Sequence, residues 1–260
     1  MNVLREAGLE AVELGGEVAG RPAAAALPAD YVHESRFGFW FLGTRTWEQR
    51  VVDVAVQDLK RLMDGPRAAA PVILDIGCGQ GKAFPALVQH LKPARLIGVD
   101  VDAAGLAMAQ AEGARCDVPV EVLESDCAAL RVPDASVDLV FCHQTLHHVV
   151  RQEETLAEIF RVLKPGGRLL LAESTREYIG SWVIRLLFRH PMHVQKSAAG
   201  YLELVRQAGF GFSPRNVSYP YLWWSRSADF GLLERFGLMR VGAPGTRKET
   251  LVNVAAHKPI

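Results

Sequence analysis

Hydrophobic and polar positions alternate in two patterns along the central part of the chain. Short runs of Val, Ile and Leu predict buried strands, and between them apolar residues recur at helical spacing. The predicted strands are residues 72–76, 95–100, 120–124, 137–142 and 168–173. The predicted helices are residues 83–91, 103–112 and 154–164. Apolar strands that alternate with helices are typical of a parallel sheet covered on both faces, so we expect an α/β, doubly wound fold.

The same two patterns continue on both sides of this region. Apolar residues follow helical spacing over 44–63, and Asp64-Gly65-Pro66 ends that helix. Toward the C-terminus the pattern predicts a helix near 198–210 and strands near 215–222 and 250–257.

Composition narrows the classes of function. Lys plus Arg and Asp plus Glu both number 29, so the formal net charge is zero. A nucleic-acid binder needs surplus positive charge to neutralise phosphates, and we therefore expect no nucleic-acid partner. The four cysteines lack C-x-x-C spacing, and no charge-free apolar run has the length of a membrane span. We expect a soluble protein of a reducing, cytoplasmic compartment.

The first predicted strand runs into Asp75-Ile76-Gly77-Cys78-Gly79-Gln80-Gly81. Glycine permits positive φ and lets the backbone approach a ligand without a Cβ in the way. The dinucleotide pattern G-x-G-x-x-G does not fit, because Lys82 stands at its third glycine. A carboxylate beside the glycines repels a pyrophosphate and suits an ammonium or sulfonium group. Since ligands of such sheets bind outside the carboxyl ends of the strands, we expect a cationic ligand here rather than NAD.

The segment LDIGCGQG (74–81) resembles motif I of the class I S-adenosylmethionine-dependent methyltransferases, and further motifs follow in the order of that family. LIGVD resembles the second strand, LESDCAAL the adenine-binding segment, and VDLVFCHQTLHHV the fourth strand with its exit. RVLKPGGRLLLAE resembles the fifth-strand signature, with a turn at 164–167, and YLELVRQAGF the penultimate helix. The resemblance covers 70–175 closely and 197–258 loosely. It implies a Rossmann-like sheet of seven strands with the last strand antiparallel, S-adenosyl-L-methionine as cofactor and S-adenosyl-L-homocysteine as product.

The resemblance also implies the residues that bind the cofactor. In the family the acidic residue at Asp100 bonds both ribose hydroxyls, and the one at Asp126 holds the adenine together with the next backbone amide. The expected cofactor-binding residues are Asp75, Gly77, Cys78, Gly79, Gly81, Asp100, Val101, Asp126, Cys127 and His143. Two structural alternatives stay open: the glycines form only a tight turn, or Asp126 caps the turn at 127–130. Asp138, inside the fourth strand, is expected to be structural.

On this basis we divide the chain into a leader and one domain. Residues 1–30, rich in Ala, Gly and Glu, are expected to be a loosely ordered leader. Residues 31–260 are long enough to form one large core and are expected to be a single methyltransferase domain. Its expected parts are an N-terminal helical cap at 31–66, a cofactor-binding core at 71–175, an apolar substrate-side insertion at 176–196 and the C-terminal half of the sheet at 197–260.

Substrate choice is expected to reside in the additions to the core. The exit of the fourth strand reads Cys142-His143-Gln144-Thr145 instead of the N-P-P-Y type that accompanies methylation of DNA and proteins in this superfamily. The chain is most similar to small-molecule methyltransferases, including the quinone-biosynthesis C-methyltransferases, which implies a hydrophobic aromatic, quinone-like or polyketide-like substrate. Expected substrate-binding residues are Tyr31, Phe37, Trp40, Trp182, His190 and His193. Residues 176–196 are interpreted as a lid that lines an apolar substrate pocket. Packing on the core and contact with a membrane surface remain the alternatives for this segment.

His143 is the expected proton acceptor, if a side chain fills that role. It is the first residue past the fourth strand, and an unperturbed imidazole titrates near a pKa of about 6.5. The alternative is that only its backbone touches the cofactor. No metal is expected, because His143 with His147, and His190 with His193, lack a third and fourth ligand at recognisable spacing. A methyltransferase-fold scaffold that binds the cofactor without turnover is the alternative function, and we expect a monomer or homodimer.

Overall fold

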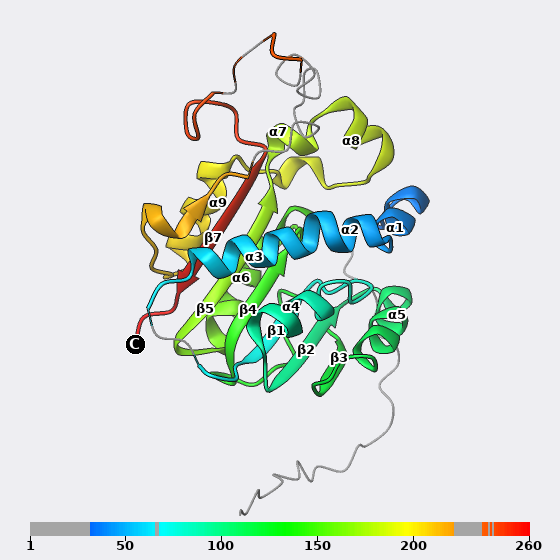
Figure 1. The fold of residues 1–260 in the computed structure, drawn as a ribbon, viewed down its shortest axis with the longest axis vertical. Coiled ribbons are helices and arrows are strands. Elements are labelled where there is room, and N and C mark those ends of the chain that lie inside the picture. The colour runs from blue at the N-terminus through cyan, green and yellow to red at the C-terminus, as the bar shows by residue number, and fades with distance from the viewer. Residues whose placement is uncertain (1–31, 66–67, 221–235, 239, 241) are drawn as a thin grey trace, which may run out of the picture.

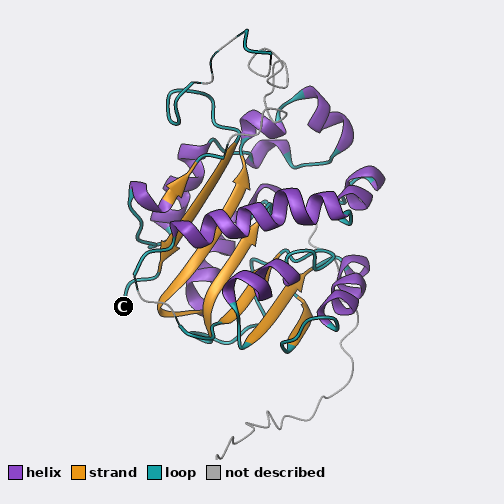
Figure 2. Cartoon of the chain, in the orientation of Figure 1, coloured by secondary structure: helices purple, strands orange, loops and turns teal. Residues whose placement is uncertain are grey.

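A single seven-stranded sheet organises the computed structural model, which describes residues 32–65, 68–220, 236–238, 240 and 242–260 (Figures 1 and 2). The strands are β1 Val72–Ile76, β2 Arg95–Asp100, β3 Val120–Glu124, β4 Val137–His143, β5 Leu163–Ser174, β6 Val217–Ser218 and β7 Leu251–His257. Their order in the sheet is β3-β2-β1-β4-β5-β7-β6. Strands β1 to β5 pair in parallel, and β7 runs antiparallel to both of its neighbours. The predicted fold class, with its antiparallel last strand, is confirmed.

Strand β1 lies at the point where the chain changes direction across the sheet. It pairs with β2 on one side and with β4 on the other, so that Ile76 lies opposite both Val99 and Cys142. The connections that leave β1 and β4 therefore diverge at the same edge. Such a switch point is where open α/β sheets bind ligands.

Helices cover both faces of the sheet, because alternate residues of each strand point to opposite sides. In β1, Ile73 packs with α3 and α4 residues such as Leu59 and Leu87, whereas Leu74 packs with α6 and α9 residues such as Leu156. The helices are α1 Arg36–Leu42, α2 Arg45–Trp47, η1 Glu48–Val52, α3 Asp53–Leu62, α4 Phe84–Leu91, α5 Ala103–Gly113, η2 Leu146–His148, α6 Gln152–Val162, α7 Arg176–Ile179, α8 Trp182–Leu187, η3 Met192–Val194, α9 Ala198–Gln207 and η4 Pro214–Asn216. Within the described residues, no helix combines the length and apolar character that crossing a membrane requires.

Three elements differ from the sequence prediction. In the part of the chain that the structure describes, the strand expected near 215–222 is present only as Val217–Ser218, because Pro214–Asn216 forms the turn η4. The helix expected over 44–63 contains a π turn, η1, between α2 and α3. Residues 164–167, expected to be a turn before the fifth strand, lie within β5 as an irregularity opposite Asp138. Asp138 holds this region by accepting hydrogen bonds from Lys164 Nζ and from the Val72 amide, both at 2.8 Å. Its expected structural role therefore has a physical basis in the folded protein.

The two additions to the core, distant in sequence, pack against each other. Segment 176–196 forms α7, α8 and η3, and Figure 1 shows α8 beside the end of the chain's first helices. The Ser35 hydroxyl donates to the carbonyl of Leu187, and the Arg189 amide donates to the Glu34 carboxylate at 3.1 Å. The expected leader, residues 1–30, lies outside the described residues, as do residues 221 and 222 of the strand expected at 215–222.

Candidate functional site

A cavity of about 620 Å³ lies at the carboxyl edge of the sheet, and two groups stand out among the described residues that line it. The first, here called the strand-end group, comprises Asp75, Gly77, Cys78, Gly79, Asp100, Val101, Asp126, Cys127 and His143. The second, here called the aromatic wall, comprises Phe39, Phe41, Trp47 and Phe188. The groups meet where the rings of Trp47 and His143 lie 5.6 Å apart. Nine of the ten predicted cofactor-binding residues thus line one cavity, and Gly81 does not.

The three glycines after β1 all have positive φ, but they differ in the space that a side chain would find. A Cβ on Gly77 would lie 2.4 Å from Thr145 Oγ1, and one on Gly81 would lie 2.9 Å from both Ala109 Cα and the Phe84 ring. Those two positions are therefore small because protein packs against them. A Cβ on Gly79 would meet nothing within 4 Å. Gly79 leaves open space on the cavity side, which is the property expected of a backbone that a ligand approaches.

Asp75 is a buried carboxyl group that lacks a partner for one oxygen. Its side chain is 2% exposed, and Oδ2 makes no hydrogen bond with any described residue. Burial, and secondly the nearby charge of Asp100, raise the pKa of Asp75 well above its usual range. An unpaired buried carboxyl group in a cavity wall is costly unless a ligand donates to it, so it suits a cationic donor such as an ammonium group.

Asp100 orders the loop after β2 and the glycine loop together. Its carboxylate accepts hydrogen bonds from the amides of Gly79 and Val101, each at 2.8 Å, and of Asp102 at 2.9 Å. Burial raises the pKa of Asp100, and these backbone donors act in the opposite direction. Oδ1 accepts from the Val101 and Asp102 amides and Oδ2 from the Gly79 amide, so Oδ2 keeps a lone pair that can accept from a ligand hydroxyl.

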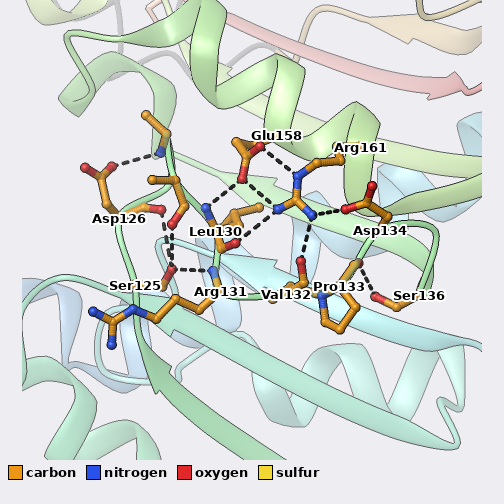
Figure 3. Close-up of polar contacts among 12 residues, drawn as sticks. Ser125, Asp126, Leu130, Arg131, Val132, Pro133, Asp134, Ser136, Glu158 and Arg161 are labelled. Carbon is orange, nitrogen blue, oxygen red and sulfur yellow. Dashed lines mark hydrogen bonds and ion pairs between the residues drawn. The ribbon is translucent and has the colours of Figure 1, made fainter. Parts of the chain in front are cut away.

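Asp126 begins a loop that α6 holds in place (Figure 3). Arg161 donates to the carbonyls of Leu130, at 3.0 Å, and Val132, at 2.9 Å, while Glu158 accepts from the Leu130 amide at 2.7 Å. The Asp126 carboxylate accepts from the Ala128 amide at 2.8 Å and pairs with Arg151. The structural alternative for Asp126, a cap of the following turn, is therefore present. It does not prevent the carboxylate from also lining the cavity.

His143 lies at the end of β4 with its ring stacked on Phe141, at 5.7 Å between ring centroids. Burial, and secondly the charge of His147, lower the pKa of His143 to about 3. The imidazole is therefore neutral at neutral pH, and a group whose conjugate acid is this strong is a weak base. The expected role of His143 as a proton acceptor remains a prediction, to which this lowered pKa is unfavourable.

Most of the predicted substrate-binding residues do not line the cavity. Trp40 and Trp182 are 63% and 65% exposed, and each lies two residues from a buried one, Gly38 or Ile184. Two residues turn an α-helix by about 200°, so both indoles face away from the interior. Among the six, His190 lines the cavity, while Phe37, Trp40, Trp182 and His193 do not and Tyr31 lies outside the described residues.

Phe37 instead supports the aromatic wall from behind. Its ring lies 5.8 Å from Phe188 and 6.1 Å from Phe41. Phe41 in turn contacts Phe188 and Trp47, at 6.1 and 5.8 Å between ring centroids. Phe37 therefore belongs to the segment that supplies the aromatic wall without lining the cavity itself.

Two buried polar residues that hold the loops around the cavity were not predicted as site residues. Gln80, which is 6% exposed, donates to the Phe39 carbonyl at 2.7 Å and so ties α1 to the glycine loop. Glu173, fully buried at the end of β5, accepts from the amides of Thr145 at 2.9 Å and Leu146 at 2.7 Å. A glutamate that ends an otherwise apolar strand is a signal that could have identified it.

Comparison with known proteins places this arrangement among methyltransferases. The sequence model of a methyltransferase-domain family matches residues 74–171. A probable S-adenosylmethionine-dependent methyltransferase of Mycolicibacterium smegmatis is 34% identical over 145 residues, which are 55% of this chain and 53% of that protein. The demethylmenaquinone methyltransferase of Thermus thermophilus is 32% identical over 127 residues, or 49% and 53% of the two chains.

Two further comparisons extend over more of the matched protein. A protein named as a methyltransferase in Encephalitozoon cuniculi is 31% identical over 171 residues, which are 58% of this chain and 75% of that protein. Among solved structures, a chain of the Haloferax volcanii complex between the Trm112 methyltransferase activator and a methyltransferase superimposes with a TM-score of 0.62. That match has 22% identity and covers 88% of this chain and all of the other, and it bears on the fold alone. The chain spans about half the length of several curated relatives that it matches.

Proposed function

The chain belongs to the family of S-adenosylmethionine-dependent methyltransferases, and from this premise we propose that it transfers a methyl group to a hydrophobic small molecule. One observation carries the proposal: a single cavity joins the carboxylates of the strand-end group to the aromatic wall. The first group suits a polar, cationic cofactor, and the second suits an apolar acceptor.

The residues on the cofactor side fit S-adenosylmethionine. The unpaired Oδ2 of Asp75 would accept from its ammonium group, and Oδ2 of Asp100 from a ribose hydroxyl. Gly79 leaves room for close approach of the ligand to the backbone. When bound, S-adenosylmethionine supplies an electrophilic methyl group on its sulfonium sulfur.

On the acceptor side, the aromatic wall offers flat apolar surfaces and excludes water. Methyl transfer from a sulfonium is an in-line displacement, so a protein contributes mainly by orienting the acceptor in a dry pocket. The rings of Phe41, Trp47 and Phe188 pack edge to face and so present a rigid wall to the acceptor. The relative from Thermus thermophilus acts, by its name, on demethylmenaquinone, which supports a quinone-like acceptor among aromatic compounds.

Ligand binding and methyl transfer test the proposal separately. We expect S-adenosylhomocysteine at about 100 times its Kd to stabilise the protein by ~2.7 kcal/mol and to raise Tm by roughly 5–10 °C. NAD at the same concentration should leave Tm unchanged. Stabilisation by NAD alone would contradict the cofactor assignment.

The transfer itself is measured with labelled S-adenosylmethionine and a set of acceptors that includes a demethylated quinol, a simple phenol and an amine. Label should move to an aromatic or quinol acceptor and not to DNA or to peptide. Binding of S-adenosylhomocysteine without transfer to any acceptor in the set would contradict the proposed activity and support the scaffold alternative.

A further inference from the structure

Three histidines from two distant segments meet in the cavity wall. His147 and His148 belong to η2, and His190 lies in the loop after α8. The ring centroids are 4.3 Å apart for His147 and His148, 5.1 Å for His147 and His190, and 4.7 Å for His148 and His190. One nitrogen of each ring lies within 4.8 Å of the corresponding nitrogens of the other two. All three residues line the cavity.

A buried carboxylate orients the first of these rings. His147 Nδ1 lies 2.7 Å from Glu173 Oε2, and the two residues are 3% and 0% exposed. The other Glu173 oxygen accepts from the Thr145 and Leu146 amides. Because an ionised carboxylate only accepts hydrogen bonds, the His147 ring donates to it through Nδ1–H. This tautomer leaves the Nε2 lone pair of His147 available. A histidine whose second nitrogen donates to a carboxylate is the usual arrangement of a metal ligand.

Two glutamines hold the segment of His190 against η2. Gln195 Nε2 donates to the carbonyl of His147 at 2.7 Å and to that of Pro191 at 3.0 Å. Gln152 Nε2 donates to the carbonyls of Leu146 at 2.8 Å and Val194 at 3.3 Å. The backbone on both sides of the cluster is therefore fixed, which preorganises the three imidazoles.

We propose that His147, His148 and His190 bind one divalent transition-metal ion, for which Zn²⁺ is the best match, with an open coordination position toward the cavity. Imidazole nitrogen suits zinc and neighbouring transition metals, whereas Mg²⁺ and Ca²⁺ require oxygen ligands. Three protein ligands with an open fourth position are typical of zinc sites that act on a ligand. In a tetrahedral site with Zn–N bonds of ~2.1 Å, the ligand nitrogens are roughly 3.4 Å apart. The nitrogens of the three rings lie within 4.8 Å of one another, so a small rotation of the side chains brings them to that distance.

The open position would take an anionic oxygen of the acceptor, such as a phenolate or enolate. That last assignment depends on the proposed methyl transfer, whereas the metal site itself does not.

The experiment is a metal titration of the full chain, expressed without a histidine tag and freed of metal by a chelator. We expect calorimetry with Zn²⁺ to show one ion bound per chain, and Co²⁺ to give the visible d–d bands of a tetrahedral site. His190→Ala and His148→Ala should weaken zinc binding by more than the ~10–100-fold that loss of an outer-shell partner costs. Glu173→Gln should fall within that 10–100-fold range.

His193→Ala is the matched control, because His193 is exposed on the same segment and does not line the cavity. It should bind zinc like the parent. Circular dichroism and S-adenosylhomocysteine binding check that each variant is folded, and they keep a failure of the metal proposal distinct from a failure of the methyltransferase proposal. Absence of stoichiometric zinc binding in the parent, or parent-like binding by His190→Ala, would overturn the site and leave the three rings as an aromatic surface for the acceptor.

Discussion

The strand-end group and the aromatic wall face the same cavity but are constructed differently. Residues of the strand-end group follow directly from strands β1 to β4, and their backbone amides bond one another's side chains, as Gly79 bonds Asp100 at 2.8 Å. The aromatic wall depends on contacts between segments far apart in the chain, such as Phe41 with Phe188. It is tied to the glycine loop through Gln80 and the Phe39 carbonyl.

The two groups therefore serve different purposes: the strand-end group is part of the fold itself, and the aromatic wall is suited to a particular acceptor. A site at parallel strand ends is fixed by the sheet, whereas a wall of loops and short helices can change its side chains without disturbing the sheet. We therefore expect substitutions in the strand-end group to affect stability and cofactor affinity, and substitutions in the wall to affect the acceptor.

The largest effect is expected for Gly77→Ala. Its Cβ would lie 2.4 Å from Thr145 Oγ1 at a φ of 68°, so overpacking and backbone strain should lower the free energy of unfolding. We expect a loss of about 2–5 kcal/mol in urea unfolding.

Gly79→Ala is the matched control for the steric clash in Gly77→Ala, because a Cβ on Gly79 would meet nothing within 4 Å. We expect a loss of stability of only ~1–2 kcal/mol from the positive φ, together with a clear loss of S-adenosylhomocysteine affinity. Equal loss of stability in the two variants would contradict the distinction between packed and ligand-facing glycines.

The next effect is that of Asp100→Ala on cofactor binding. Removing the charge-assisted hydrogen bond of this carboxylate to the ribose should weaken S-adenosylhomocysteine binding by ~1.5–3 kcal/mol, measured by calorimetry. The variant also loses the acceptor of the Gly79 and Val101 amides, so Tm should fall as well. Binding as tight as that of the parent would remove Asp100 from the ribose role.

A smaller effect is expected at the aromatic wall. Phe41→Ala removes ring contacts with Trp47 and Phe188 and should cost ~1–2 kcal/mol of stability. S-adenosylhomocysteine affinity should stay within about twofold, because the ring contacts of Phe41 are with Trp47 and Phe188 of the wall and not with the carboxylates of the strand-end group.

Trp40→Ala is the control for Phe41→Ala. Its side chain is 63% exposed and does not line the cavity, so stability should change by no more than ~0.5 kcal/mol. The KM for the acceptor should rise in Phe41→Ala and remain unchanged in Trp40→Ala. The reverse order would show that the exposed indole, and not the wall, contacts the acceptor.

The smallest effect concerns His143 and pH. Its pKa is lowered to about 3 by burial, so below the unfolded-state pKa of ~6.5 the unfolded chain binds a proton that the folded chain does not. Stability should therefore fall as pH falls, by ~1 kcal/mol from this group between about pH 7 and pH 5.5. His143→Asn should show a shallower pH dependence of urea unfolding than the parent.

The turnover of His143→Asn tests whether His143 accepts a proton from the substrate. A weak base contributes little to the rate, so the variant should keep turnover within a factor of a few of the parent. A fall of about a hundredfold or more at unchanged cofactor affinity would instead establish His143 as the proton acceptor.

The sequence by itself determined the sheet and the strand-end group. Apolar strands in alternation with helices predicted the parallel order, and polar residues at strand ends necessarily gather at one edge of such a sheet. For this reason Asp75, Gly79 and Asp100 were correctly expected to lie together. Their positions depend on local sequence and on strand order, both of which the hydrophobic pattern encodes.

Only the tertiary structure decided which side chains of the additions face the cavity. Helical spacing does not fix the rotation of a short helix. Trp40 and Trp182, expected to bind the substrate, are therefore exposed and do not line the cavity. Spacing along the chain also paired His143 with His147 and His190 with His193, whereas the fold brings His190 to His147 and His148. The physical reason is that these contacts join segments more than 40 residues apart. They depend on side-chain packing and on hydrogen bonds such as that of Gln195 to His147, 48 residues away. No local sequence pattern specifies such contacts.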